Sequence, residues 1–203
     1  MTESPLSATW EARYRGRQVW SGRVNRSLQL VAAGVAAGNA LDLACGEGGD
    51  AVWLAQQGWV VTAVDFAESA LARLREAAES RGVLNRVNTQ RADLSQWSSK
   101  AVFDLVSCHF LHESENIRRR AFRAAAEATA RGGTLLIVGH SLDEDESLPG
   151  PPAESRWDPA WVVEAAGLDD GWLVVTEQRE RQDGHHGSEG ASRTDAIVIA
   201  RRR

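Results

Sequence analysis

A short apolar run that ends in an acidic residue and breaks into a glycine-rich turn is the feature that most constrains this chain. Residues 40–50 read Ala-Leu-Asp-Leu-Ala-Cys-Gly-Glu-Gly-Gly-Asp, and a helical pattern follows over 51–57. A second apolar run over 59–64 ends at Asp65. A strand, a turn of small residues, a helix and a second strand ending in a carboxylate suit an adenosine-containing cofactor. Small residues let the backbone approach the ligand, and the carboxylate can accept hydrogen bonds from ribose hydroxyls.

The size and composition of the chain fit one globular domain. It has 203 residues, of which 43% are hydrophobic and 25% charged, as is usual for a soluble protein. No apolar run reaches the roughly 18 residues that span a bilayer, and the first residues lack the pattern of a signal peptide. Two cysteines, Cys45 and Cys108, indicate reduced thiols. We therefore expect a cytoplasmic protein with no membrane partner.

The charge of the chain argues against nucleic acid as its partner. The formal net charge is −5, whereas phosphate binding normally needs a basic face. Arginines gather in residues 10–26 and at the end of the chain, Arg201 to Arg203. A solvated helix face and a frayed tail explain both clusters most simply.

Apolar runs alternate with helical patterns from residue 39 onward, which indicates a parallel sheet with crossover helices. Strands are expected near 39–44, 59–65, 86–92, 102–108 and 133–139, and helices near 49–57, 68–81, 116–130 and 158–167. Two further strands, near 172–176 and 196–200, have no helix between them and should pair antiparallel. The expected fold is α/β, with three αβα layers around a mostly parallel seven-stranded sheet that ends in an antiparallel hairpin.

Helix boundaries also have local signals. Start signals are Asp50, Glu68 or Ser69, and the pair Asp158-Pro159, because such residues cap or begin helices. Stop signals are Gly58, Gly82, the pair Gly132-Gly133, and Gly167, since glycine ends helices readily.

These motifs resemble those of the class I S-adenosylmethionine-dependent methyltransferases over residues 39–201. The matching segments are Leu41–Gly48 (the glycine-rich motif), Val64–Leu71 (the ribose-binding acid), Ala92–Leu94 (the adenine contact), Phe103–Val106 (the fourth strand) and Arg131–Leu135 (the turn into the fifth). The N-terminal Trp10, Tyr14, Trp20 and Asn25 further resemble the small tellurite-resistance and thiopurine-methyltransferase-like members. The resemblance implies a Rossmann-like core over 39–203 and an N-terminal helical lid over 1–38, together one domain.

The resemblance also implies which residues bind S-adenosylmethionine. They are Trp20, Asp42, Ala44, Cys45, Gly46, Gly48, Asp65, Phe66, Asp93, Leu94, Cys108 and His109. Ala44 departs from the family, which often has glycine there. Alanine fits at this position if the backbone has a negative φ.

The same turn can be interpreted as a degenerate dinucleotide fingerprint, so an NAD(P)-dependent oxidoreductase is the alternative. Three features favour S-adenosylmethionine. Asp42 precedes the turn and suits a cofactor with an ammonium group and a sulfonium, Asp93 supplies a third acidic contact, and the hairpin closes the sheet. A non-catalytic protein that binds S-adenosylmethionine is a further alternative.

The N-terminal aromatic residues have two interpretations. Trp10 and Tyr14 are spaced i, i+4, so both rings should lie on one helix face. They could dock this helix on the sheet. Trp20 could instead belong to a lid that covers the cofactor and excludes water from methyl transfer.

All five histidines map to one rim of the expected sheet, the edge where ligands bind. They are His109, His112, His140, His185 and His186. His112 and His140 are the candidates for a catalytic base, because imidazole titrates near neutral pH, and ordinary loop capping is the alternative. A metal held by His109-x-x-His112 is disfavoured because the pair lies on no clear helix, so no metal is expected.

Two loops should hang over the substrate entrance. Residues 141–157 are acidic and proline-rich, and residues 180–193 are glycine-rich and polar. Long loops in compact domains are commonly functional or disordered, so both gating and disorder are open.

The acceptor is expected to be a small molecule, with the protein a monomer or homodimer. Ser107-Cys108-His109-Phe110 stands where methyltransferases acting on nucleobase amino groups have an Asn/Asp-Pro-Pro-Tyr-type motif. This argues against nucleic-acid amines and leaves thiol, oxygen and small-molecule nitrogen acceptors open.

Overall fold

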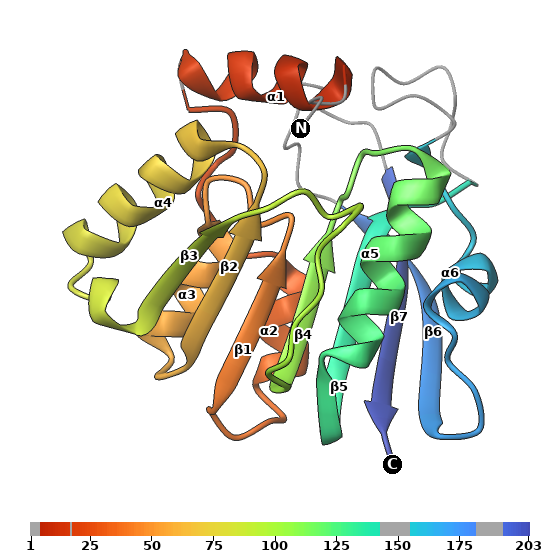
Figure 1. The fold of residues 1–203 in the computed structure, drawn as a ribbon. Helices are drawn as coiled ribbons and strands as arrows, with labels where there is room; N and C mark the ends of the chain where they lie inside the picture. The colour runs from red at the N-terminus through yellow and green to blue at the C-terminus, as the bar shows by residue number, and fades with distance from the viewer. Residues whose placement is uncertain (1–4, 17, 143–154, 182–192) are drawn as a thin grey trace.

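A twisted seven-stranded sheet forms the centre of the molecule (Figure 1). The computed structural model describes residues 5–16, 18–142, 155–181 and 193–203. The strands are β1 (Asn39–Leu43), β2 (Val60–Asp65), β3 (Val87–Arg91), β4 (Phe103–His109), β5 (Thr129–His140), β6 (Trp172–Arg181) and β7 (Arg193–Arg202). Their order is β3-β2-β1-β4-β5-β7-β6. β7 runs antiparallel to both of its neighbours, β5 and β6, which confirms the expected closing hairpin.

Helices cover both faces of this sheet. The helices of the described residues are α1 (Pro5–Arg15), α2 (Arg26–Ala32), α3 (Gly49–Gln56), α4 (Glu68–Ser80), α5 (Glu115–Glu127) and α6 (Pro159–Ala166), with a short 3-10 turn η1 (Leu84–Arg86). Figure 1 shows α5 and α6 in front of the sheet and α2 and α3 behind it. The three-layer αβα architecture is therefore confirmed.

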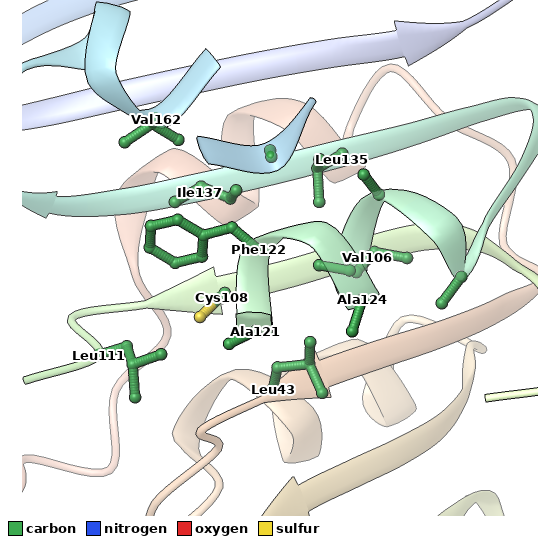
Figure 2. Packing of buried hydrophobic residues seen from close by; sticks show 14 of the residues in the cluster. Leu43, Val106, Cys108, Leu111, Ala121, Phe122, Ala124, Leu135, Ile137 and Val162 are labelled. Carbon is green, nitrogen blue, oxygen red and sulfur yellow. The ribbon is translucent and has the colours of Figure 1, made fainter. Parts of the chain in front are cut away.

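The larger hydrophobic cluster lies between the sheet and helices α5 and α6 (Figure 2). Leu43 and Ile137 extend from the strands toward Phe122 of α5 and Val162 of α6, and all four side chains are buried. Burying a side chain of this size contributes roughly 1.5–3 kcal/mol. A second cluster, which includes Leu54, packs the opposite face against α2, α3 and α4.

Helix α6 shows how completely local signals can set an element. Asp158 is its N-cap, and the carboxylate accepts a hydrogen bond from the Ala160 amide at 2.7 Å. Pro159 opens the first turn, and Gly167 ends the helix with a φ of 69°. The helix expected near 158–167 is thus present with the expected cap and stop.

Two expectations about the other elements are wrong. Helix α5 ends at Glu127 and β5 begins at Thr129, because the Ala128 carbonyl accepts a hydrogen bond from the Phe103 amide at 2.8 Å. This contact starts strand pairing before the glycine pair is reached. The terminal arginines are not a frayed tail, since Arg202 lies in β7 and its Nη1 donates to the Thr129 carbonyl at 2.6 Å.

The parallel strands bring their carboxyl ends to one edge of the sheet. β1, β2, β4 and β5 end there at Leu43, Asp65, His109 and His140, and α1 lies across this edge in Figure 1. No helix in the described part of the chain is long and apolar enough to cross a membrane. The chemistry expected at this edge can now be traced residue by residue.

Candidate cofactor and acceptor site

The carboxyl edge of the sheet opens on a cavity of about 170 Å³. Its walls come from the glycine-rich turn after β1, the end of β2, the segment after β4, the end of β5, and the N-terminal residues that follow α1. Segments distant in sequence therefore meet at one place, as the strand order requires.

The turn after β1 has a left-handed backbone at three positions. The φ angles are 56° at Ala44, 51° at Gly46 and 79° at Gly48. The expectation of a negative φ at Ala44 is therefore wrong. The backbone amide of the next residue, Cys45, donates a hydrogen bond to the Val64 carbonyl of β2 at 3.2 Å. The turn thus holds Ala44 in a left-handed conformation that costs alanine free energy.

We expect the Ala44→Gly variant to be more stable than the wild type by about 0.5–1 kcal/mol, since glycine relieves left-handed strain but loses more chain entropy on folding. Urea unfolding measures this difference. Ala70→Gly is the control, because Ala70 lies inside α4 and glycine in a helix interior should destabilise. A loss of stability in Ala44→Gly would contradict the strain argument.

Asp42 carries a buried carboxylate oxygen without a partner. The residue is 2% exposed and lines the cavity. Its Oδ1 accepts a hydrogen bond from the Ser107 hydroxyl at 3.2 Å, whereas Oδ2 has no hydrogen-bond partner among the described residues. Burial, and then the neighbouring charge of Asp50, raise the pKa of Asp42 to about 8. A buried carboxyl group with an unpaired oxygen favours the binding of a cation or a hydrogen-bond donor.

Asp50 and His109 form a buried pair beside Asp42. Nδ1 of His109 lies 3.0 Å from Oδ2 of Asp50. Burial alone would lower the pKa of His109, but the Asp50 carboxylate raises it. Burial conversely opposes ionisation of Asp50, and its neighbours His109 and Asn25 nevertheless hold its pKa below the usual value. Both shifts favour the ionic form of the pair.

Asp50 lies in the first turn of α3, where the start signal is expected, but its carboxylate does not cap the helix. Gly48 occupies the N-cap position of α3, and the Asp50 carboxylate accepts two hydrogen bonds from Asn25. The backbone amide of Asn25 lies at 2.7 Å and its side-chain amide at 2.8 Å. Asp50 thereby joins the N-terminal segment to the turn.

Asp65 fixes the glycine-rich turn from the end of β2. Its carboxylate accepts hydrogen bonds from the amides of Gly46 and Ala67, each at 2.9 Å. Burial raises its pKa to about 6. Asp65 and its neighbour Phe66 line the cavity, where the expected ribose contact stays a prediction.

The third acidic segment lies outside this cavity. Asp93 is exposed and accepts a hydrogen bond from the Ser95 amide at 2.8 Å, while Leu94 is buried in the large hydrophobic cluster. Their expected adenine contact stays a prediction. Cys45 lines the cavity, whereas Cys108 is buried in the same cluster as Leu94, and burial raises the pKa of both thiols.

The N-terminal segment lies over the glycine-rich turn. The Trp20 indole donates to the Tyr14 hydroxyl at 3.0 Å, and the rings of Trp10 and Tyr14 stack 5.8 Å apart. A Cβ added at Gly46 would meet the Tyr14 hydroxyl at 3.2 Å. All three aromatic residues line the cavity, which favours a lid that also packs.

Glu47 holds this segment in place, a role that its sequence context does not reveal. Its carboxylate accepts hydrogen bonds from the Val19 amide at 3.0 Å and the Trp20 amide at 2.8 Å. Nη1 of Arg73 on α4 lies 3.0 Å from the same carboxylate, and Nη2 donates to the Gly16 carbonyl. Glu47 is 6% exposed, so these contacts are largely shielded from water.

We expect Glu47→Gln to destabilise the protein by about 1–3 kcal/mol and to weaken cofactor binding several-fold, because a buried charged partner of Arg73 and of two amides is lost. Calorimetry with S-adenosylhomocysteine and urea unfolding measure both effects. The control is Glu68→Gln, whose half-exposed pair with Arg75 should change stability by less than about 0.5 kcal/mol. Equal effects of the two substitutions would contradict the role of Glu47.

Two of the histidines that line the cavity, His112 and His140, gather with aromatic rings. The rings of His112 and His140 stack 5.3 Å apart. Trp10 stacks on His112 at 6.2 Å, and Phe110 lies 5.0 Å from His140. His109, His112 and His140 all line the cavity, in agreement with the expected rim; His185 and His186 lie outside the described residues, as does most of both polar loops.

Phe110 has a strained backbone that the sequence did not reveal. Its φ is 52°, and its amide donates to the Val138 carbonyl at 2.8 Å. Strained non-glycine residues cluster at functional sites. Here the bend separates His109, which pairs with Asp50, from His112, which stacks on His140.

The arrangement can hold a cation beside the turn. Asp42, Asp50 and His109 bring three potential ligand atoms within 4.8 Å of one another, a different set from the His109-x-x-His112 pair. His109 and Asn25 already bind the Asp50 carboxylate. Asp42 is therefore the member of this group that can still bind a cation. One ammonium group suits such a position better than a divalent ion.

The comparisons with known proteins agree with this geometry. Residues 40–133 match the family model of a methyltransferase domain. A putative methyltransferase of Geobacillus sp. (strain WCH70) is 32% identical over 106 residues, which are 50% of this chain and 42% of that protein. The chain therefore aligns with less than half of the length of this curated relative.

Three solved structures share the fold. A protein studied for the conversion of a disulfide bond into a thioacetal group during echinomycin biosynthesis is 22% identical, with a TM-score of 0.74 over 97% of this chain and 92% of the other. TehB from Haemophilus influenzae is 19% identical, with a TM-score of 0.71 over 89% and 63%. The glycopeptide N-methyltransferase MtfA, complexed with S-adenosylmethionine, is 17% identical, with a TM-score of 0.65 over 100% and 99%.

Proposed function

We propose that this chain transfers a methyl group from S-adenosylmethionine to a small-molecule acceptor, because residues 40–133 match the family model of a methyltransferase domain. The observation that carries the proposal is Asp42 Oδ2, which is buried at the cavity without a hydrogen-bond donor among the described residues. An ammonium group supplies the missing donors and charge.

The residues present fit this cofactor. Asp42 would bind its ammonium group, and Gly46 and Gly48 allow the backbone of the turn to approach its amino-acid end. A side chain at Gly48 would collide with Leu74, so only glycine leaves the turn in this shape. Asp65 would contact the ribose, and Trp20 would cover the bound molecule from the N-terminal segment. Asp93 and Leu94 are proposed for adenine.

When bound, S-adenosylmethionine supplies a methyl group on a sulfonium, which an acceptor nucleophile can displace in line. The protein's part is mainly positioning, since charge is lost as the reaction proceeds. The segment that contains Trp20 excludes water from the cavity. His112 and His140 hold or accept the acceptor's proton at an imidazole nitrogen.

The decisive experiment is calorimetry with S-adenosylhomocysteine and with NADH, followed by screening of thiols, phenols and amines for acceptor-dependent release of S-adenosylhomocysteine. Binding of S-adenosylhomocysteine and turnover support the proposal. Tight NADH binding alone would favour the oxidoreductase, and cofactor binding without turnover over the whole panel would favour a non-catalytic protein. The cytoplasmic location and the absence of a nucleic-acid partner stay predictions.

We expect His112→Ala and His140→Ala each to lower kcat by about 10²-fold or more if the imidazole takes the acceptor's proton, with little change in affinity for S-adenosylhomocysteine. Steady-state kinetics with the best acceptor and calorimetry separate the two effects. Full turnover in both variants would leave the cofactor site intact and remove the histidines from the mechanism.

A further inference from the structure

The carboxylates that line the cavity differ in whether hydrogen-bond donors and cations surround them. Five carboxylates of the described residues line it: Asp42, Glu47, Asp50, Asp65 and Glu113. Backbone amides and arginine satisfy Glu47, Asn25 and His109 satisfy Asp50, and two backbone amides satisfy Asp65. Asp42 is assigned above to the cofactor. Glu113 is the remaining carboxylate, and no role has been assigned to it so far.

Glu113 presents an oxygen that the rest of the described chain leaves unpaired. Its Oε2 is buried and has no hydrogen-bond partner among the described residues. Arg118 donates to its backbone carbonyl at 2.6 Å, and the Arg118 guanidinium lies over the rings of Trp157 and Trp161, 5.4 Å from each. Burial, with a contribution from Asp93, raises the pKa of Glu113, whereas the Ser114 amide and the Arg118 charge act in the opposite direction.

Glu113 also lines the same cavity as the stacked rings. It directly follows His112, whose ring stacks on His140 and on Trp10. The cofactor side is formed by the glycine-rich turn, and Arg23, the one arginine or lysine among the described lining residues, lies there with its carbonyl close to Gly49. The cavity therefore combines flat rings with one carboxylate oxygen that has no hydrogen-bond partner among the described residues.

We propose that the acceptor is an amine attached to a flat apolar group, and that Glu113 binds its ammonium form while the rings of Trp10, Phe110 and His112 contact the apolar group. This inference rests on the proposed function and names its substrate class. A carboxylate bonds an ammonium about twice as strongly as a neutral hydroxyl and repels carboxylates and thiolates. Aromatic walls favour planar ligands.

The chemistry balances with the residues at hand. The ammonium loses one proton to a neutral imidazole of the His112–His140 pair, and the proton passes to water. The free nitrogen lone pair then forms the new N–C bond, while the electron pair of the broken S–C bond stays on sulfur. The product is a methylated ammonium and a neutral thioether.

The test uses three probes that share a phenyl ring: 2-phenylethylamine, 2-phenylethanol and phenylacetate. Each is titrated at pH 7 into protein saturated with S-adenosylhomocysteine, with quenching of tryptophan fluorescence as the readout, because Trp10 and Trp20 line the cavity. We expect the amine to bind at least about tenfold more tightly than the alcohol, and phenylacetate to bind most weakly.

The variant Glu113→Gln should remove this preference and leave the affinity for 2-phenylethanol unchanged. Glu115→Gln is the matched control, because Glu115 lies two residues away but is exposed and pairs with Arg119. Equal affinity for amine and alcohol in the wild type, or a preference that survives Glu113→Gln, would overturn the amine assignment while S-adenosylhomocysteine still binds. Failure of S-adenosylhomocysteine to bind would instead overturn the proposed function, and the assignment with it.

Discussion

We expect the Asp42→Asn variant to be more stable than the wild type at pH 8 and to bind the cofactor far more weakly. Asp42 is buried, and its pKa is raised from 3.8 to about 8. An acid with this shift keeps its proton in the folded state, so its contribution to stability is complete below about pH 4 and is lost as the pH rises through 8. Asparagine cannot ionise and retains a partner for Ser107. The expected gain at pH 8 is a few kcal/mol.

The neighbours of Asp42 change this pH dependence in known directions. His109 has a raised pKa, so its stabilisation is also lost as the pH rises through that value. Asp50 has a lowered pKa, so its stabilisation is present above the usual carboxyl range and is lost in acid. A shallower slope above the usual histidine range should therefore persist in Asp42→Asn, because Asp50 still raises the pKa of His109 after the contribution of Asp42 is lost.

The ionised carboxylate of Asp42, which lowers the stability of the protein, should strengthen cofactor binding. Binding of an ammonium beside Asp42 favours the ionised carboxylate, so S-adenosylhomocysteine binding to the wild type at pH 7 should release a proton, detectable by calorimetry in buffers of different ionisation enthalpy. Asp42→Asn should release none and bind at least about tenfold more weakly. Asp170→Asn, at an exposed position, is the control. Unchanged stability together with unchanged affinity would contradict the role of Asp42.

Sequence patterns predicted the sheet well because each strand and helix carries its own signals. The alternation of apolar runs and helical patterns predicted all seven strands and the final hairpin. Helix α6 has both its expected cap and its expected stop. The shared rim of His109, His112 and His140 followed from strand direction alone. Such features depend on residues close in sequence or on the general geometry of parallel sheets.

Contacts between distant segments explain what the sequence did not reveal. Glu47 holds Val19 and Trp20, which are 28 and 27 residues away, and no local pattern distinguishes such a carboxylate from a solvated one. The backbone of Ala44 is held left-handed by its surroundings although alanine disfavours that conformation. Asp50 has the sequence of a helix start, yet its carboxylate is used by Asn25 and His109.

We expect Gly48→Ala to cause the largest loss of stability of the substitutions considered. Gly48 has a φ of 79°, and an added Cβ would collide with the side chain of Leu74, which is fully buried on α4. Left-handed strain costs about 1–2 kcal/mol, and forcing a methyl group into a packed core adds about 1–3 kcal/mol. The expected total is therefore about 2–5 kcal/mol, measured by urea unfolding.

Gly82→Ala separates the two contributions. Gly82 has a φ of 67°, and nothing lies within 4 Å of an added Cβ, so this variant should lose only the strain of about 1–2 kcal/mol. Adding Leu74→Ala to Gly48→Ala should cost less than the two single substitutions predict, because removing the Leu74 side chain removes the collision. Equal losses in Gly48→Ala and Gly82→Ala, or strict additivity with Leu74→Ala, would mean that the turn moves away from α4 without resistance. The left-handed turn that approaches the cofactor would then be held by its own hydrogen bonds to β2 and Asp65, and not by its packing on α4.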